Sequence, residues 1–425
     1  MTGAWDPKAG WRILRDTHGT VLAVLLKALL IALLMLPAAV PLLLMALVTG
    51  LLVRHRRSLR FRTTGMWTTP GPYAMLYFLL HALGMFWTED LAFGAFDLQI
   101  KAPLLVLPLL GMLLPMPARR GREVLFMGLG LASAGAVLLC LAGASILLIV
   151  DPTVAPAEAF FSSRFSRFLH PSYFAMYLCT ALAGWYLTPV HTLPSALIKH
   201  GVPALAVVGI ILCGSKMGWA VMAVMLPLAM AVRWREKALR RTLGLALVGA
   251  LLGVSTLVVV SPNARSRVQE AWQAAMAPGT TSDASTSSAV RRITWSTAWA
   301  LFKQDPLKGT GTGDVKNELM RSYREHGQEW VLEHRLNAHS QFLQSAACLG
   351  VSGSLALLLM GFAPFFGRLR KDPFIVAFML LSVGNWTVES MLEVQAGVVF
   401  FTLILLLMDW TTVPSEERSS QPCAQ

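Results

Sequence analysis

The chain has 425 residues, of which 55% are hydrophobic and only 14% are charged. Soluble globular chains carry about 25% charged residues, so this composition excludes a soluble domain and predicts an integral membrane protein. Lysine and arginine outnumber aspartate and glutamate by 36 to 23. Without a soluble basic domain, this excess argues against nucleic-acid binding and is typical of positive charge on one side of a bilayer. The 5 cysteines are scattered, and they predict neither a disulfide framework nor a metal cluster.

Apolar runs of the length that a membrane span needs, about 20 residues, recur along the chain. We expect spans at residues 19–36, 38–53, 72–88, 98–115, 124–150, 171–188, 199–213, 217–232, 242–260, 341–364, 373–389 and 394–410. Pro37 and Pro41 separate the first two runs, and one long kinked helix is the alternative there. The first run continues into the second without a small-residue cleavage site, which favours an uncleaved span.

Charge asymmetry favours about twelve spans with both termini in the cytoplasm. In that topology, basic residues gather in the cytoplasmic segments: Arg54, Arg56, Arg57, Arg60, Arg62, Arg119, Arg120, Arg122, Arg233, Arg235, Lys237, Arg240, Arg241, Arg368, Arg370 and Lys371. The opposite short connections carry acidic residues, namely Glu89, Asp90, Asp97, Glu389 and Glu393. We therefore predict an all-α polytopic membrane protein.

One connection between apolar runs is much longer than the others. It divides the chain into spans one to nine at residues 1–260, a large outer loop at 261–340, spans ten to twelve at 341–411, and a cytoplasmic tail at 412–425. A loop of this length without secondary structure is uncommon, so we expect it to fold over the membrane mouth and to carry function. Its helical stretches are predicted at Val268–Met276, Ser288–Phe302 and Asp314–His326.

Cationic side chains gather on the predicted outer side. Arg265, Arg291 and Arg292 lie in the large loop, Arg164 lies in a smaller outer loop, and Lys216 lies where one span ends and the next begins. Arginine presents a planar fork that pairs with two phosphate oxygens. Together these residues can form a cationic cup suited to a lipid-linked pyrophosphate. Singly, each arginine is also explained by contact with lipid headgroups or water.

For Lys216, a lysine that reaches to the membrane interface is an equal alternative, and for Lys27 and Lys101 it is the favoured interpretation. The segment Lys308–Asp314 contains three glycines, but it lacks the strand and the ending of a phosphate-binding loop. A turn that exploits glycine is the favoured interpretation there.

His339 lies where the large loop re-enters the membrane. An unperturbed imidazole titrates near pH 6.5, so it can accept a proton from a sugar hydroxyl near neutral pH. His334 lies five residues before it, without a carboxylate or cysteine at ligand spacing, which argues against a zinc site. Glu389 and Glu393 are candidate ion-pair partners of the loop arginines or candidate parts of an acceptor site.

Several separated blocks of the chain resemble the O-antigen ligase family, within the ligase and polymerase superfamily. The blocks, which lie within residues 100–410, are Arg164 with His170-Pro171, Gly214-Ser215-Lys216, Arg265, Arg291-Arg292-Ile293-Thr294-Trp295 through Gly309-Thr310-Gly311, and Glu389 through Gly397. The most specific block is His339-Ser340, then nine residues, Gly350, two residues and Gly353. Members of the family usually have Ser-Arg where this chain has Ser215-Lys216, so a charge remains but the planar fork does not.

The resemblance implies a GT-C-like fold with a periplasmic loop, and an inverting, metal-independent glycosyltransferase without a cofactor. Such an enzyme in the bacterial inner membrane would move O-antigen glycan from undecaprenyl pyrophosphate to a sugar hydroxyl of lipid A–core, on the periplasmic side. It implies His339 as the base, with pyrophosphate and glycan bound by Arg265, Arg292, Arg291, Lys216, Arg164 and Glu389.

Three alternatives remain open. An O-antigen polymerase would use the same donor with a second lipid-linked glycan as acceptor, and a protein O-oligosaccharyltransferase would modify serine or threonine of a secreted protein. A transporter or flippase is a more distant alternative, since transporters often have two similar halves and charges near the bilayer midplane. Here the halves differ, and the notable charges lie at the predicted outer mouth.

Overall fold

The structure is a computed structural model that describes residues 21–57, 59, 61, 66–114, 120–188, 196–276 and 287–411. Several residues of the predicted topology lie outside this described part, among them Arg60, Arg62, Arg119 and the tail at 412–425.

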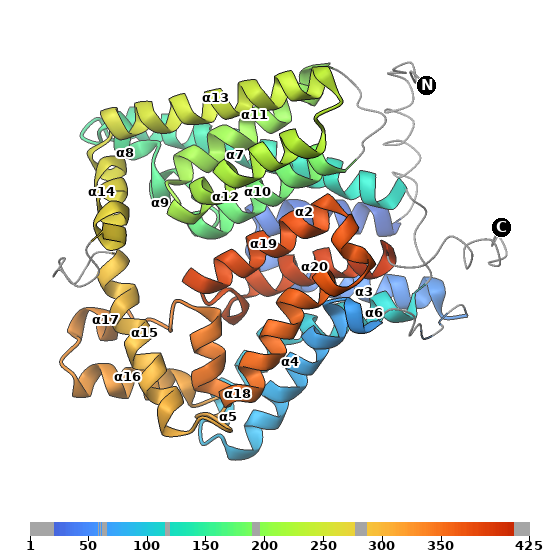
Figure 1. Cartoon of the computed structure of the whole chain (residues 1–425), viewed down its shortest axis with the longest axis vertical. Coiled ribbons are helices and arrows are strands. Elements are labelled where there is room, and N and C mark those ends of the chain that lie inside the picture. Colours follow the sequence, from blue (N-terminus) through green and yellow to red (C-terminus); the bar gives the residue numbers. More distant parts are fainter. Residues whose placement is uncertain are drawn as a thin grey trace. The chain divides into compact units, whose positions relative to one another are not determined.

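All regular elements of the described residues are helical (Figure 1). The α-helices are α2 (Val21–Met35), α3 (Val40–His55), α4 (Gly71–Gly84), α5 (Leu91–Lys101), α6 (Pro103–Leu113), α7 (Arg120–Val150), α8 (Pro156–Ala159), α9 (Ser162–Phe165), α10 (Pro171–Leu187), α11 (Ala196–Cys213), α12 (Lys216–Val232), α13 (Lys237–Val260), α14 (Pro262–Met276), α15 (Ser287–Gln304), α16 (Val315–Glu325), α17 (Glu329–Glu333), α18 (Gln341–Phe362), α19 (Pro373–Val388) and α20 (Gln395–Thr411). The short 3₁₀ helices are η1 (Pro37–Ala39), η2 (Met66–Thr68), η3 (Met85–Trp87), η4 (Ala363–Phe366), η5 (Arg368–Lys371) and η6 (Met391–Glu393).

Each apolar run predicted from the sequence corresponds to a helix, which confirms the helical fold class. Among the described residues, 5 stretches are long and apolar enough to cross a membrane: Pro37–His55, Leu91–Leu113, Leu125–Val150, Leu239–Val260 and Gln341–Phe366. Shorter apolar helices cover Val24–Met35, Leu197–Leu212, Lys216–Val232, Pro373–Val388 and Gln395–Leu406. The chain therefore has the character of a helical membrane protein, while the number of spans and the side of the large loop stay predictions.

The chain forms two compact units, each built from two separate stretches. The first unit comprises Met1–Arg56 and Pro117–Trp272, and the second comprises Arg57–Met116 and Gln273–Gln425. The two units are described in turn.

In the first unit, α2 and α3 are two separate helices rather than one kinked helix. The chain leaves helical geometry at Leu36 (φ −138°, ψ 64°) and re-enters it through η1. Leu22, near the start of α2, lies against Gly50, near the end of α3: a Cβ on Gly50 would be 2.7 Å from Leu22 Cδ2. The two helices therefore pack side by side with opposite directions, which resolves the alternative left by Pro37 and Pro41.

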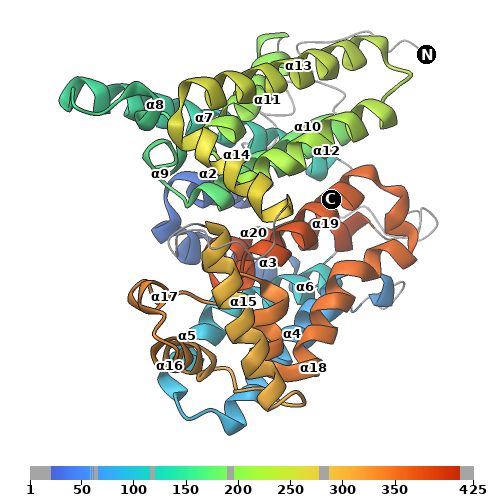
Figure 2. The ribbon, with the colours of Figure 1, turned by 60° about the vertical axis from the view of Figure 1, so that its left-hand side comes forward.

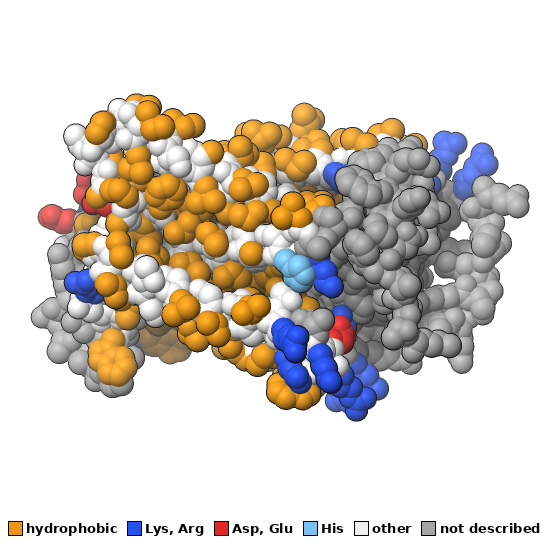
Figure 3. Space-filling model, turned by 90° about the horizontal axis from the view of Figure 1, so that it is seen from above, with side chains coloured by type: hydrophobic (Ala, Val, Ile, Leu, Met, Phe, Trp, Pro, Cys, Tyr) orange, Lys and Arg blue, Asp and Glu red, His pale blue; other side chains and the backbone are white. Residues whose placement is uncertain are grey.

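The exposed face of α13 is hydrophobic. Leu245, Leu252 and Val259 are each more than 60% exposed, and Figure 3 shows hydrophobic side chains over most of the described surface on this face. An apolar surface of this extent on a water-soluble monomer would be unusual, and it fits contact with lipid. Lysine and arginine side chains gather at one end of the face (Figure 3), and the exposed Arg235 and Lys237 lie where α13 begins.

The second unit holds the helices of the large loop against α18. α15 lies alongside α18 (Figure 2), α16 packs on α15, and α17 packs on α16. Their shared core consists of Val290, Ala298, Leu301, Val315, Leu319, Met320, Tyr323, Val331, Ala338, Ala347, Cys348 and Leu349. The predicted helices at 268–276, 288–302 and 314–326 are thus confirmed as α14, α15 and α16.

Carboxylates tie α16 to the turn between α4 and α5. The two oxygens of Asp314 accept hydrogen bonds from the backbone N–H groups of Glu89 and Asp90, each at 2.8 Å. Asp90 in turn accepts from the Phe93 N–H at 3.0 Å and from Asn317 at 2.9 Å. These hydrogen bonds lower the pKa of the Asp90 carboxyl below its ordinary value. The start of α16 is therefore fixed to the turn between α4 and α5.

The glycine-rich segment 309–311 supports a break in α18. Gly350 has φ 64° and ψ −149°, outside helical geometry. A helix break leaves backbone groups without partners, and the N–H groups of Thr310 and Gly311 donate to the carbonyls of Ala347 and Cys348 at 2.9 and 3.0 Å. This arrangement confirms segment 309–311 as a structural turn. It also explains why Gly350, eleven residues after His339, is a glycine.

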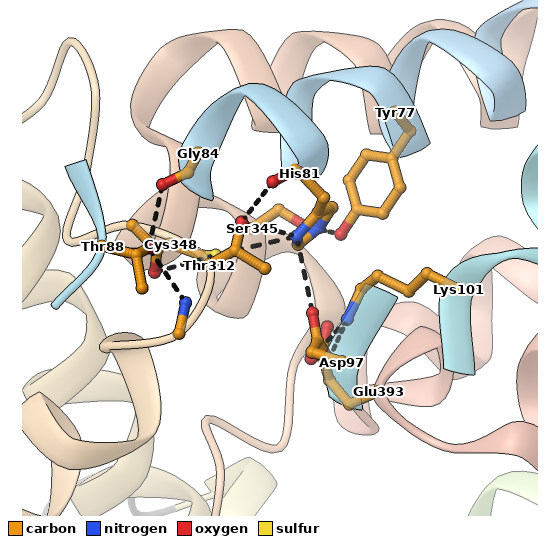
Figure 4. A network of polar contacts seen from close by, with 12 residues as sticks. Tyr77, His81, Gly84, Thr88, Asp97, Lys101, Thr312, Ser345, Cys348 and Glu393 are labelled. Carbon is orange, nitrogen blue, oxygen red and sulfur yellow. Dashed lines mark hydrogen bonds and ion pairs between the residues drawn. The ribbon is translucent and has the colours of Figure 1, made fainter. Parts of the chain in front are cut away.

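Two expectations from the sequence are wrong. Asp97 does not lie in a connection: it belongs to α5 and is 5% exposed. Lys101 does not reach an interface, because it is fully buried and pairs with Asp97 at 2.6 Å and with Glu393 at 2.8 Å (Figure 4). The carboxylate of Glu393, which pairs with Lys101, lies 292 residues away in sequence, so no local sequence pattern predicts this ion pair.

Candidate functional site

His339 occupies a constrained turn immediately before α18. Its φ is 45°, in the left-handed region that side chains rarely adopt and that is often found at functional sites. Its N–H donates to Asn337 Oδ1 at 3.0 Å, and its carbonyl accepts from Trp295 Nε1 of α15 at 3.1 Å. Ser340 follows as the N-cap of α18. The loop and the membrane helix thus jointly fix the position of the imidazole.

Glu389, which follows the last residue of α19, faces this imidazole. Its Oε2 lies 3.3 Å from His339 Nδ1, and the two side chains are 13% and 26% exposed. A carboxylate at Nδ1 favours the tautomer that carries its proton there, which leaves the lone pair of Nε2 as a proton acceptor. The pair therefore has the arrangement of an oriented general base.

Arg291 of α15 fixes the other side of Glu389. Its Nη2 lies 3.3 Å from Glu389 Oε1, and its Nε donates to the carbonyl of Val388 at 3.1 Å. Of the two alternatives left open for Glu389, the ion pair with a loop arginine is thus observed. Arg291 thus serves first to hold Glu389.

Arg292 lies next to Arg291 on α15 and is exposed. Successive residues of a helix point about 100° apart, so the side chains of the two arginines leave α15 in different directions. In the second unit, the structure thus brings His339, Glu389 and Arg291 together, with Arg292 adjacent in sequence on the same helix.

The other predicted phosphate ligands belong to the first unit. Lys216 is the first residue of α12, and its Nζ lies 2.9 Å from Glu270 Oε2, with both side chains 24% exposed. Arg265 is exposed, and its Nη2 donates to the carbonyl of Val259 at 2.7 Å, at the end of α13. Arg164 is also exposed and pairs with Glu158 at 2.9 Å. A common cup formed with the residues of the second unit stays a prediction.

Some residues of these sites were missed in the sequence. Arg267 donates to Ser162 Oγ at 2.9 Å and lies over the ring of Phe161, 5.6 Å from its centroid. Its place two residues after Arg265 was the only available signal. Trp295 and Asn337 were missed because their contacts to His339 are made through the backbone of His339.

His334 does not share the environment of His339. It is exposed, it stacks on Trp330 at 4.1 Å between ring centroids, and its Nδ1 lies 2.8 Å from the carbonyl of Trp330. Among the described residues, no three histidine, cysteine, aspartate or glutamate side chains form a group that could hold a metal ion.

Comparison with models of known protein families identifies a match for part of the chain. The profile of the protein family described as O-antigen ligase matches residues 202–358. This stretch includes Lys216, Arg265, Arg291, Arg292 and His339. No curated protein matches the chain. The match confirms the resemblance to this family for the blocks between Gly214 and Gly353, which lie within the matched residues.

Proposed function

We propose that this chain, whose residues 202–358 match the family described as O-antigen ligase, transfers a lipid-linked O-antigen glycan to a sugar hydroxyl of lipid A–core. The observation that carries the proposal is the contact of His339 Nδ1 with Glu389 Oε2 at 3.3 Å, in a chain that matches this family. A histidine oriented by a carboxylate is suited to removing a proton from a hydroxyl group.

In the proposed reaction, Nε2 of His339 takes the proton of the acceptor hydroxyl. The oxygen forms a bond to the anomeric carbon of the donor sugar from the side opposite the pyrophosphate. The bond between that carbon and the pyrophosphate oxygen breaks, and the electron pair leaves with undecaprenyl pyrophosphate, so the configuration inverts. Glu389 stabilises the imidazolium that forms, and the proton then passes to water.

The departing pyrophosphate carries the negative charge that develops in this step. Fixed cationic groups are well suited to stabilising it, since they need little rearrangement during the reaction. We assign this role to Arg292, Arg265 and Lys216, with Arg164 as a further ligand. Lys216 already faces Glu270, so donor phosphate would compete with that carboxylate for its ammonium group.

The exposed apolar face of α13 and the apolar helices support a place in a membrane. The positive-inside pattern and the family together favour the bacterial inner membrane, with His339 on the periplasmic side. The partners are then the undecaprenyl-pyrophosphate donor, lipid A–core and membrane lipids.

Gel analysis of lipopolysaccharide from a deletion strain tests this function. A deletion strain complemented with the wild type should show long glycans on lipid A–core. The same strain with His339→Ala should accumulate lipid-linked polymer without attachment. If the deletion instead leaves single glycan units attached to the core, the chain is a polymerase. An unchanged ladder would overturn the proposal in favour of protein glycosylation or transport.

A further inference from the structure

We propose that a buried group formed by Lys101, Gln341 and Glu393, here called the Glu393 anchor, positions Glu389 toward His339. This inference rests on the proposed function, because it concerns how the base of that reaction is oriented. All of its residues lie in the second unit. None of them touches the imidazole of His339 through a contact that we observe, so they are positioning residues.

Lys101 supplies the charged contact of the anchor. Its side chain is fully buried, and Nζ lies 2.8 Å from Glu393 Oε2 and 2.6 Å from Asp97 Oδ1 (Figure 4). Burial removes the water that would otherwise solvate the ammonium group, so the two carboxylates stabilise its charge instead. Lys101 is the last residue of α5, and Glu393 is the last residue of η6. The ion pair therefore fixes the segment between α19 and α20 to α5.

Gln341 supplies the neutral contacts, from the first turn of α18. Its Nε2 donates to Glu393 Oε1 at 2.9 Å and to the hydroxyl of Tyr77 at 3.0 Å. Its Oε1 accepts from the Leu392 N–H at 2.6 Å. One amide thus holds both a backbone group and a side chain of the same short segment. Because Gln341 comes two residues after His339, the anchor joins this segment to the chain that carries the imidazole.

The segment from Glu389 to Glu393 is short and is held at both ends. Glu389 N–H donates to the carbonyl of Asn385 at the end of α19, at 2.8 Å. At the other end, Glu393 is held by Lys101 and Gln341. Between the two ends, the carbonyl oxygen of Met391 lies so close to α20 that it leaves no room for a Cβ on Gly397. With both ends fixed, a displacement of Glu393 must be taken up within three intervening residues. Glu389 lies at the start of that stretch, so its carboxylate moves with the anchor.

The Glu393 anchor contains buried charges, and packing alone does not explain them. A buried lysine beside two carboxylates is costly to assemble, and replacement of such groups by apolar residues is often neutral or stabilising. Its presence here is explained if it fixes one conformation of the segment between α19 and α20. Within the second unit, Arg291 and His339 also contact the Glu389 carboxylate, at 3.3 Å each.

Glu393→Gln tests the anchor with the least disturbance. Glutamine keeps the size of the side chain and leaves Lys101 paired with Asp97, so one cation still faces one carboxylate. It has only one oxygen, however, whereas Glu393 uses one oxygen for Lys101 and the other for Gln341. One of the two contacts must be lost. Glu333→Gln, at an exposed site on α17, is the matched control.

We expect Glu393→Gln to lower kcat about 10-fold, as loss of an orienting partner typically does, with little change in the KM for donor. Gln341→Leu removes the neutral contacts without touching the ion pairs, and we expect the same result. The decisive readout is a double-mutant cycle with Glu389→Ala. A residue that acts through Glu389 should have no further effect once that carboxylate is absent.

If the effects of Glu393→Gln and Gln341→Leu on kcat each add fully to the effect of Glu389→Ala, the inference is overturned, because the effects are then general and structural. Unchanged kcat in both single variants would overturn it as well. The assay is transfer from undecaprenyl-pyrophosphate-linked glycan to lipid A–core by the purified full chain, normalised to folded protein by thermal melting. If the wild type itself shows no transfer, the proposed function fails. If the wild type transfers and the cycle is additive, only the anchor fails.

Discussion

Oε2 of Glu389 lies 3.3 Å from Nδ1 of His339, although 50 residues separate them in sequence. The imidazole precedes α18 and the carboxylate follows α19, so the packing of these two helices creates the contact. Arg291 reaches the same carboxylate from α15, a helix of the large loop. The loop and the membrane helices thus each contribute one part of a single site.

Removal of the Glu389 carboxylate should weaken transfer without abolishing it. We expect Glu389→Gln to lower kcat about 10- to 100-fold, because the imidazole loses the partner that orients it. The measurement is initial-rate kinetics of the purified protein with defined donor and acceptor. Glu333→Gln on the same unit is the control and should retain full activity. A Glu389→Gln variant with wild-type kcat would show that the contact has no part in the reaction.

Arg265→Ala should raise the KM for the lipid-linked donor. Loss of a charged hydrogen bond to phosphate costs about 1.5–3 kcal/mol, which corresponds to roughly a 10- to 100-fold weaker interaction. Arg241→Ala, at an exposed position near the start of the preceding helix α13, should leave the KM unchanged. Arg265 also bonds to carbonyls at the end of α13, so thermal melting must accompany the kinetics. Equal kinetic effects of both variants would indicate folding or topology instead of donor binding.

Transfer should persist in excess EDTA. In the proposed mechanism, arginine and lysine side chains neutralise the leaving pyrophosphate. Many glycosyltransferases use a divalent cation for this purpose. The measurement compares the initial rate of the dialysed protein with EDTA and with added Mg²⁺ or Mn²⁺. A strict requirement for either cation would contradict the metal-independent mechanism.

Gly350→Ala should destabilise the protein. The residue has φ 64°, and its Cβ would lie 2.5 Å from the carbonyl oxygen of Pro306. We expect backbone strain alone to lower the free energy of unfolding by about 1–3 kcal/mol, and the steric clash to lower it further. Gly244→Ala is the matched control, because no atom lies within 4 Å of its added Cβ in α13. A melting temperature of Gly350→Ala equal to that of the control would contradict the close approach.

The helices were predictable from the sequence, because long apolar runs are local properties. His339 was identified from its place at the end of the loop and from the spacing to Gly350. These features depend on residues near one another in the chain.

The contacts that complete the site could not be predicted in this way. Glu389 was recognised as acidic, but nothing in the sequence distinguished an arginine partner from a histidine partner, and it has both. Lys101 was misinterpreted because the carboxylate of Glu393 reaches it only in the folded protein. The break at Gly350 was also missed, since its hydrogen-bond partners lie in another segment.

The most direct test of the central claim is transfer by purified His339→Ala compared with His334→Ala, using an undecaprenyl-pyrophosphate-linked glycan and lipid A–core. His334 is exposed and stacked on Trp330, so its loss should leave the rate unchanged. Loss of a general base lowers a rate about 10²- to 10⁴-fold, and we predict a decrease of this size for His339→Ala at equal folded protein. Undiminished transfer by the His339→Ala variant would contradict the account.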